Sequence, residues 1–309
     1  MKLMHILLLG LVALTSCRRG ERNEPLIAVI VPSQDNPFFK AEADATVAAA
    51  TSLGYRTRVD AHDDDAYRQD NLVDAAIASG ARAIVLDNAG SESSISAVRR
   101  ATKEGIAVFL IDREIQVQGI AKAQIVADNR QGAHIVAAEF SRAVRQGEYA
   151  ELLGRESDTN AQVRTNGFHE VLDKVPTLKL VSAQSANWSQ EEAFQKTETV
   201  LQAHPQLAGI IAGNDTMAVG AAAAVKSSGR QGIVITGFDG SPDAISAIQS
   251  GDMDATTLQP AVLIAKLAVK EADQFLKTGS TGQPEKQVIS CDLVTRQNAK
   301  DYSNFEKIK

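Results

Sequence analysis

The sequence predicts an α/β protein made of two doubly wound lobes, each a parallel sheet with helices on both faces. Short apolar runs such as LIAVIV (26–31), ARAIVL (81–86) and IVITGF (233–238) alternate with amphipathic segments of roughly 12 to 16 residues. Strands that alternate with helices in this way form parallel sheets. The stretches 79–114 and 204–241 share one order of strand, polar turn, helix, strand and polar turn. This shared order indicates two similar lobes rather than one large sheet.

The individual elements follow the same alternation from residue 26 onwards. Further β-rich runs are YRTRVD, IAVFLID and AQIVAD, followed after a helical piece at 131–145 by AELLG, LKLVSA and LAGIIAG. Helical segments include 66–79 and 189–203. Glycine follows several of these segments, as in SLGY and ASGA, which is typical of a helix end before the next strand.

Composition and charge limit the function classes. The chain has 309 residues, of which 44% are hydrophobic and 23% charged, enough for two domains with cores of their own. The formal net charge is −6, and the tight basic pairs are Arg18-Arg19 and Arg99-Arg100. A nucleic-acid partner is therefore not expected, because such proteins usually carry a basic face.

The first residues read as an export signal. Lys2 precedes the apolar run ILLLGLVAL (6–14), which is too short to span a bilayer, and LTSC ends at Cys17. LTSC resembles a bacterial lipobox, which predicts a lipoprotein signal peptide at 1–16, acylation of Cys17 and a polar linker at 17–25. The protein would then be held by lipid in the periplasm or at the cell-envelope surface. An ordinary signal cut nearby, with Cys17 incidental, is the alternative.

Polar and aromatic side chains follow the predicted strands, at the edge where open α/β sheets bind ligands. In the first turn, DNPFF, Asn36 is expected to cap a helix that starts at Pro37 and presents two adjacent phenylalanines. Carboxylates, amides and guanidinium groups recognise hydroxyls, and aromatic faces stack on the C–H side of a sugar. The candidate residues for such a site are Asn36, Phe38, Phe39, Asp87, Asp112, Arg113, Arg164, Trp188, Asn214, Asp239 and Gln259.

Each candidate also has a structural explanation. Asp or Asn after a strand is commonly a turn or a helix cap, and a lone phenylalanine usually belongs to the core. The prediction therefore depends on the whole set of strand ends and not on any one residue.

The motifs NPFF, ARAIVLDNAG, FLIDRE, RTNGF, GNDTMAVGA, GFDGSPDAI, GDMDATTLQP and LVTRQN occur in this order between about residues 26 and 298. In this order they resemble the ribose-type periplasmic binding proteins of sugar ABC transporters. The resemblance implies the type I fold of that family, with an N-terminal lobe at 26–127 plus 261–290 and a C-terminal lobe at 128–260 plus 291–309. Hinges are expected near Ala127-Asp128, Gln259-Pro260 and Ser290-Asp292.

The resemblance also implies that the candidate residues contact a monosaccharide or sugar alcohol. Asp87 stands where the ribose binders have Asn, and the wide Trp188 replaces a smaller ring. Both departures favour a pentose other than ribose, or a polyol. Asp215, in GNDTMA, is expected to cap a helix or to join the lobes.

The expected function is solute binding by hinge closure, with delivery to a membrane permease. The chain would act as a monomer without cofactor or metal, and would meet the membrane only through its lipid. The alternative within the same fold is a sensor that presents its sugar to a chemoreceptor or sensor kinase.

Enzymatic readings find little support. No G-x-G-x-x-G follows the first strand, and no P-loop or G-x-S-x-G is present. AHDDDA (61–66) reads as a solvated loop, and His134, His169 and His204 lack metal-ligand spacing. Asp112 and Asp239 could form an acid–base pair, but Arg113 is expected to hold Asp112 ionised.

Two single features exclude further interpretations. A sugar-responsive repressor would need a helix-turn-helix of about 60 residues where the leader stands. Cys291 has no partner thiol in the body of the chain and is expected to be a small buried hydrophobe.

Overall fold

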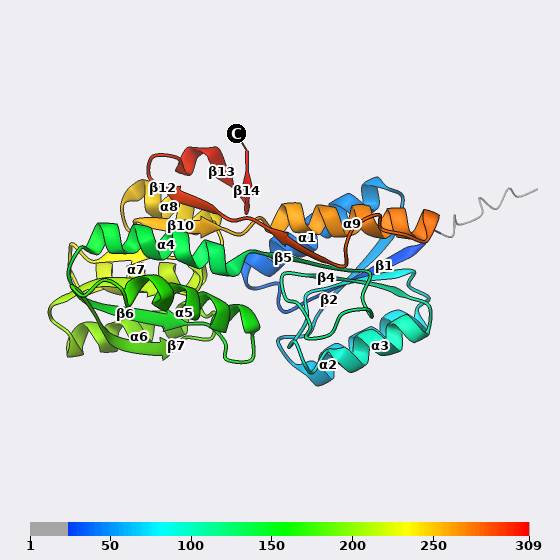
Figure 1. Cartoon of the computed structure of the whole chain (residues 1–309), viewed down its shortest axis with the longest axis horizontal. Coiled ribbons are helices and arrows are strands. Elements are labelled where there is room, and N and C mark those ends of the chain that lie inside the picture. Colours follow the sequence, from blue (N-terminus) through cyan, green and yellow to red (C-terminus); the bar gives the residue numbers. More distant parts are fainter. Residues whose placement is uncertain (1–23, 309) are drawn as a thin grey trace, which may run out of the picture.

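The computed structural model describes residues 24–308, which form two α/β lobes side by side (Figure 1). In the first lobe the strands are β1 (Leu26–Val31), β2 (Arg56–Ala61), β3 (Ala83–Leu86), β4 (Ala107–Ile111), β5 (Ala123–Ala127) and β11 (Lys286–Ile289). They form one sheet in the order β11-β5-β4-β3-β1-β2, and all neighbouring pairs are parallel. The helices of this lobe are α1 (Pro37–Ser52), α2 (Ala66–Ala78), α3 (Ile95–Lys103) and α9 (Ala261–Thr278).

The second lobe repeats this plan. Its strands are β6 (Gly147–Leu153), β7 (Leu178–Ser185), β8 (Leu207–Ala212), β9 (Val234–Thr236), β10 (Ala255–Leu258) and β12 (Asp292–Thr295), in the order β12-β10-β9-β8-β6-β7. Its helices are α4 (Asn129–Val144), α5 (Thr159–Leu172), α6 (Gln190–Ala203), α7 (Asp215–Ser227) and α8 (Pro242–Ser250). The predicted fold class, two doubly wound sheets, is confirmed. One edge pair departs from the prediction, because β12 runs antiparallel to β10.

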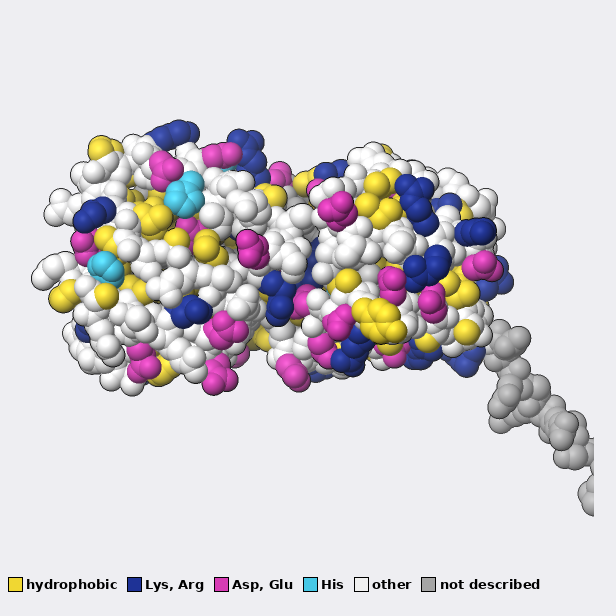
Figure 2. All heavy atoms as spheres, turned by 90° about the horizontal axis from the view of Figure 1, so that it is seen from below, with side chains coloured by type: hydrophobic (Ala, Val, Ile, Leu, Met, Phe, Trp, Pro, Cys, Tyr) yellow, Lys and Arg dark blue, Asp and Glu magenta, His cyan; other side chains and the backbone are white. Residues whose placement is uncertain are grey.

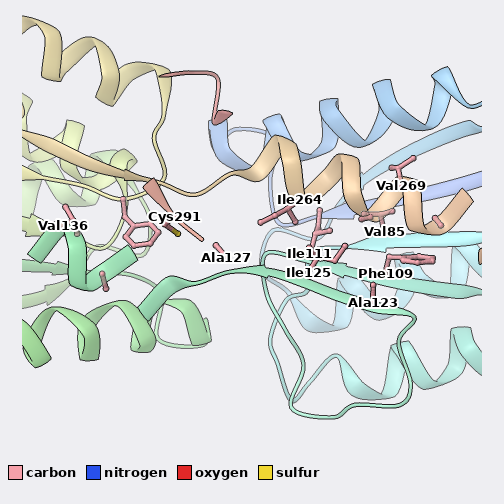
Figure 3. Close-up of a cluster of buried hydrophobic side chains, with 14 of the residues drawn as sticks. Val85, Phe109, Ile111, Ala123, Ile125, Ala127, Val136, Ile264, Val269 and Cys291 are labelled. Carbon is pink, nitrogen blue, oxygen red and sulfur yellow. The ribbon is translucent and has the colours of Figure 1, made fainter. Parts of the chain in front are cut away.

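The chain passes between the two sheets at three places, from β5 to α4, from β10 to α9 and from β11 to β12. Apolar packing continues through these crossings, since one cluster of buried side chains includes Phe109 and Ile125 of the first lobe with Val136 and Phe140 of the second. Figure 3 shows Ala127 and Cys291 on neighbouring segments where the ribbon passes from one lobe to the other. Cys291 is buried, as predicted, and burial raises the pKa of its thiol to about 12.

The last described residues contact both lobes. After the short 3-10 helix η1 (Ala299–Asp301), the chain forms a hairpin of β13 (Tyr302–Ser303) and β14 (Glu306–Lys307). Tyr302 belongs to the core of the second lobe, whereas Phe305 packs edge-on against Phe38 of the first, with ring centroids 5.5 Å apart. The hairpin therefore touches a lobe to which the sequence had not assigned it.

The leader and Cys17 lie outside the described residues. Among residues 24–308, no helix has the length and apolar character needed to cross a bilayer.

Candidate functional site

The strand order of each sheet places a ligand-binding crevice at a defined point. In a doubly wound sheet of order 2-1-3-4-5, ligands bind beyond the carboxyl ends of the two central strands where the winding direction changes. In the first lobe these strands are β1 and β3, and in the second they are β6 and β8. The turns that follow them carry Asn36, Asp87, Asp158 and Asn214, which all lie near the junction of the lobes.

A small cavity lies where these turns meet. Its volume is about 20 Å³, which suits about one water molecule, and both lobes contribute to its wall. The wall contains the predicted residues Asn36, Phe38, Phe39, Asp112, Arg164, Trp188, Asn214 and Asp239, together with Asp158 and Asn160. Because a sugar is several times larger than a water molecule, it can reach these side chains only if the lobes separate.

Arg164 organises the second-lobe half of the cavity. It lies on α5, almost fully buried, and its guanidinium donates to the Asn129 side chain at 2.7 Å, to the Gly213 carbonyl at 2.9 Å and to Asp239 at 3.1 Å. A further bond reaches the side-chain oxygen of Gln259. The guanidinium also stacks on Phe238, 3.9 Å from the ring centroid. This network fixes its planar fork toward the cavity, as bidentate recognition requires.

Asp112 is the first-lobe counterpart. It follows β4, and its Oδ1 accepts from Asn160 Nδ2 at 3.1 Å and from Gln259 Nε2. The φ of Asp112 is 56°, in the left-handed region that non-glycine residues rarely adopt, and Asp239 has φ 122°. Backbone strain of this kind is typical of functional sites, where the surrounding structure holds a residue in place.

Arg113 lies at the centre of a buried group of carboxylates. Its guanidinium is 2.9 Å from Asp158, 2.8 Å from Asp64 and 3.5 Å from Asp87. Asp158 comes from the second lobe and the others from the first, so this group joins the lobes. The guanidinium also lies over the Phe39 ring, 5.1 Å from its centroid.

Burial dominates the protonation of the site. It raises the pKa of Asp112, with a further upward contribution from Asp158, and the nearby guanidinium groups of Arg113 and Arg164 offset this only in part. Arg113 favours the ionised form of Asp112, as expected, but burial outweighs this effect, so the net shift of the Asp112 pKa is upward. The closest ion pairs of Arg113 are with Asp158 and Asp64, whereas its guanidinium lies 3.8 Å from the Asp112 carboxylate.

The aromatic residues form two walls. Asn36 caps α1 by accepting from the Phe38 amide at 3.0 Å, with Pro37 at the first helical position, as predicted. Phe38 and Phe39 then pack edge to face, 5.6 Å apart, and both line the cavity. Trp188 lines both the cavity and a wider opening, and its indole nitrogen has no hydrogen-bond partner among residues 24–308.

The wider opening lies beside the cavity and shares Asn36, Phe39 and Trp188 with its wall. Its volume is about 600 Å³, and its wall includes Ser33, Asp35 and Asp64 from the first lobe with Arg155, Asn187 and Glu191 from the second. Asp64 lies 3.2 Å from Arg155, which forms a second ion pair between the lobes. Figure 2 shows acidic and basic side chains side by side at the narrow junction of the two lobes, on the face that it draws.

The segment 61–66 matches the predicted solvated loop only in part, since Asp63 and Asp65 are exposed but His62 is not. His62 is fully buried, with Nε2 2.8 Å from the Asp87 carbonyl and Nδ1 3.1 Å from the Asp64 amide. Asp65 caps α2, and Asp64 faces Arg113. The turn reaches the first switch-point region because His62 contacts the backbone carbonyl of Asp87, which follows β3.

Asp215 plays a structural part within the second lobe. Its carboxylate accepts from the Ser241 amide and from Thr256 Oγ1, both at 2.6 Å. Asp215 therefore joins the turns that hold Asn214 and Asp239. The N-cap of α7 is not Asp215 but Asn214, whose side chain accepts from the Met217 amide at 2.9 Å.

Sequence reasoning missed several polar residues of this site. Asp64, Asp158 and Asn129 follow β2, β6 and β5, so the same rule of strand ends would have found them. Asn160 follows Asp158 by two positions. Glu42 had a different signal, since it lies on α1 in line with the buried Phe38, Phe39 and Thr46.

Taken together, the site offers carboxylates, amides and guanidinium groups at close range, with aromatic walls. These groups can satisfy the hydroxyls of a small polar molecule on all sides once the lobes close.

Comparison with known proteins agrees with this geometry. A family model described as a periplasmic binding protein domain matches residues 27–281. The D-apiose import binding protein of Paraburkholderia graminis is 58% identical over 275 residues, covering 89% of this chain and 88% of that protein. A protein of the same name from Actinobacillus succinogenes is 51% identical over 287 residues, covering 92% of each.

A solved structure shares the architecture as well. It is an ABC transporter periplasmic solute binding protein from Actinobacillus succinogenes 130z with bound D-allose, and it superimposes with a TM-score of 0.84 at 27% identity. The match covers 90% of this chain and 100% of that one. The family resemblance predicted from the motifs is thus confirmed, and the chain belongs to the periplasmic binding protein family.

Proposed function

We propose that this protein is the solute-binding component of a sugar ABC importer and that its ligand is D-apiose, a branched pentose. The observation that carries the proposal is the convergence of Asp112, Arg164 and Asp239, from both lobes, on one closable cavity. Two relatives of more than half identity, described above, are both named for D-apiose import, which favours this sugar among the pentoses. As in its family, the function is binding without conversion of the ligand.

Binding would proceed by closure of the lobes around the three chain crossings. In the closed arrangement Gln259 bonds both Asp112 and Arg164, so these polar groups satisfy one another. A sugar would replace such bonds with bonds to its own hydroxyls while Trp188 and Phe39 cover its apolar faces. On this basis we assign the eleven predicted residues to ligand contact or to its direct support. We also propose that the moving units are one lobe of 26–127 with 261–290 and one of 128–260 with 291–309.

Calorimetric titration with a panel of D-apiose, D-ribose, D-allose and myo-inositol tests the ligand. A few charge-assisted hydrogen bonds of roughly 1.5–3 kcal/mol each, less association costs, support a micromolar or tighter complex, which requires about 8 kcal/mol. We expect D-apiose to bind at least about tenfold more tightly than the others, a difference of about 1.4 kcal/mol. Tighter binding of another panel member would reassign the ligand, and no binding by any of them would remove the sugar-binding function.

The same proposal covers the location of the protein. We propose that Cys17, at the end of LTSC, is acylated and that the mature chain is a monomer tethered to the envelope. In cells, Cys17→Ala should move the protein from the detergent-soluble membrane fraction to the aqueous fraction, because the lipid is its only proposed anchor. Cys291→Ala is the matched control and should stay with the membrane. Equal partitioning of Cys17→Ala and the parent would refute the tether.

A further inference from the structure

Glu42 is a buried carboxyl group with no visible role in the fold. It lies on the face of α1 that packs toward the sheet, one turn after Phe38, and its side chain is fully buried. Neither carboxyl oxygen has a hydrogen-bond donor among the described residues. Taking an unpaired carboxylate out of water is costly, so burial favours the neutral, protonated form of the Glu42 carboxyl.

Its neighbour is the proposed sugar-binding residue Asp87. Asp87 follows β3 at the first switch point, is equally buried, and has no hydrogen bond to either carboxyl oxygen. The nearby cation does not satisfy it, because Arg113 Nε stands 3.5 Å away without a hydrogen bond. The imidazole of His62 is also committed elsewhere, to the Asp87 backbone carbonyl and the Asp64 amide.

Negative groups outnumber cations around this pair. The pair consists of Glu42 on α1 and Asp87 after β3. The charged and titratable groups around it are His62 and Asp64 after β2, Asp112 and Arg113 after β4, and Asp158 with Arg155 from the turn before α5. Fully ionised, the pair and these groups comprise five carboxylates against two guanidinium groups. A neutral sugar adds no charge, so the excess is relieved most simply by a proton.

We propose that Glu42 is a positioning residue that shares one proton with Asp87 and so orients the Asp87 carboxyl toward the sugar. The proposal rests on the proposed sugar-binding function. One carboxyl donates its O–H to the other, which satisfies a donor and an acceptor and leaves the pair with a single negative charge. The remaining lone pairs of Asp87 can then accept a sugar hydroxyl.

Closure of the lobes should take up this proton from solvent. Burial is the first cause that raises the pKa of both carboxyls. Arg113 lowers the pKa of Asp87, but the charges of Asp112 and Asp158 raise it, and the net shift is upward. Opening would admit water and remove the second-lobe carboxylate of Asp158, and both changes lower the pKa of Asp87. The closed, sugar-bound state therefore holds more protons, and affinity should fall as pH rises through the raised pKa of the pair.

Proton uptake is measurable by calorimetry in buffers of different ionisation enthalpy, between pH 6 and 9. The parent should take up a fraction of a proton, up to one, with affinity falling by up to about tenfold per pH unit where a full proton is coupled. Glu42→Gln keeps a hydrogen-bond donor but cannot hold the proton, so uptake and the pH slope should both decrease. Glu42→Leu, which offers no donor, should also weaken binding at pH 7 by about tenfold or more relative to Glu42→Gln.

The control is Glu271→Gln, a buried carboxyl on α9 that accepts from Gln287 away from the cleft. It should leave proton uptake and affinity as in the parent. Equal proton uptake by the parent and Glu42→Gln would overturn the proposal. A purely structural role would lower the stability of both Glu42 variants without changing the number of protons taken up.

A second measurement separates failure of this proposal from failure of the proposed function. If D-apiose does not bind, the titration is repeated with whichever panel sugar does. If none binds, the pH dependence of unfolding tests the shared proton instead. This is possible because α1 and β3 belong to one lobe and keep Glu42 and Asp87 together without a sugar. A pair with raised folded-state pKa values stabilises the fold at acid pH and loses this contribution as pH rises. Glu42→Gln should therefore reduce the decline in the free energy of unfolding with rising pH. Parallel curves for both proteins would overturn the proposal without any sugar.

Discussion

Replacing Arg164 with alanine is expected to weaken sugar binding by about a thousandfold or more. The buried guanidinium holds Asn129, Asp239 and Gln259 at once and stacks on Phe238. Hydrogen bonds to charged groups contribute roughly 1.5–3 kcal/mol each, and two of them account for a factor of this size. Loss of the cation also leaves the Asp239 carboxylate buried without its partner, which is more costly than the bond alone.

Calorimetry on folded variants tests this expectation. Arg164→Lys keeps a charge but not the planar fork, so it should recover only part of the affinity. Arg142→Ala is the matched control, since Arg142 is an exposed residue of α4 that pairs with Glu139, and its loss should leave binding as in the parent. An Arg164→Ala protein that melts cooperatively and still binds within about tenfold of the parent would show that the fork is not a sugar contact.

Gly154→Ala is expected to weaken binding by about a hundredfold, although residue 154 need not touch the sugar. A Cβ atom at Gly154 would stand 2.0 Å from Trp188 Cη2 and 2.4 Å from Cζ3, closer than atoms can pack. The backbone at Gly154 is not in the left-handed region, so crowding is the only cost of the methyl group. The indole would have to leave its position against the cavity.

The chain contains a single tryptophan, which makes the displacement directly observable. The fluorescence of Gly154→Ala should shift toward that of a water-exposed indole, and added sugar should change it less than in the parent. In a Trp188→Ala background, Gly154→Ala should have almost no further effect on affinity, because the space is already empty. Independent, additive losses in the double variant would show that Gly154 acts by some route other than the indole.

Periodicity and strand-end chemistry were sufficient to predict the two doubly wound sheets and most of the cavity wall. This worked for Asp112, Asp239 and Asn214, because the carboxyl ends of parallel strands meet at one edge whatever the details of packing. It succeeded only in part for the segment 61–66, where three consecutive aspartates read as a solvated turn. In the structure Asp64 instead faces Arg113, and His62 is buried behind it.

The sequence by itself determined the alternation of strands and helices, the cap at Asn36 and the polar strand ends, since each depends on neighbours along the chain. Only the tertiary structure decided the pairing of Arg113 with Asp158, the burial of Glu42 and Asp87 without hydrogen-bond donors, and the fit of Trp188 against Gly154. These contacts join separate elements, and the pair of Arg113 with Asp158 also crosses from one lobe to the other. Their distances follow from how the sheets and helices pack, which no local pattern of residues records.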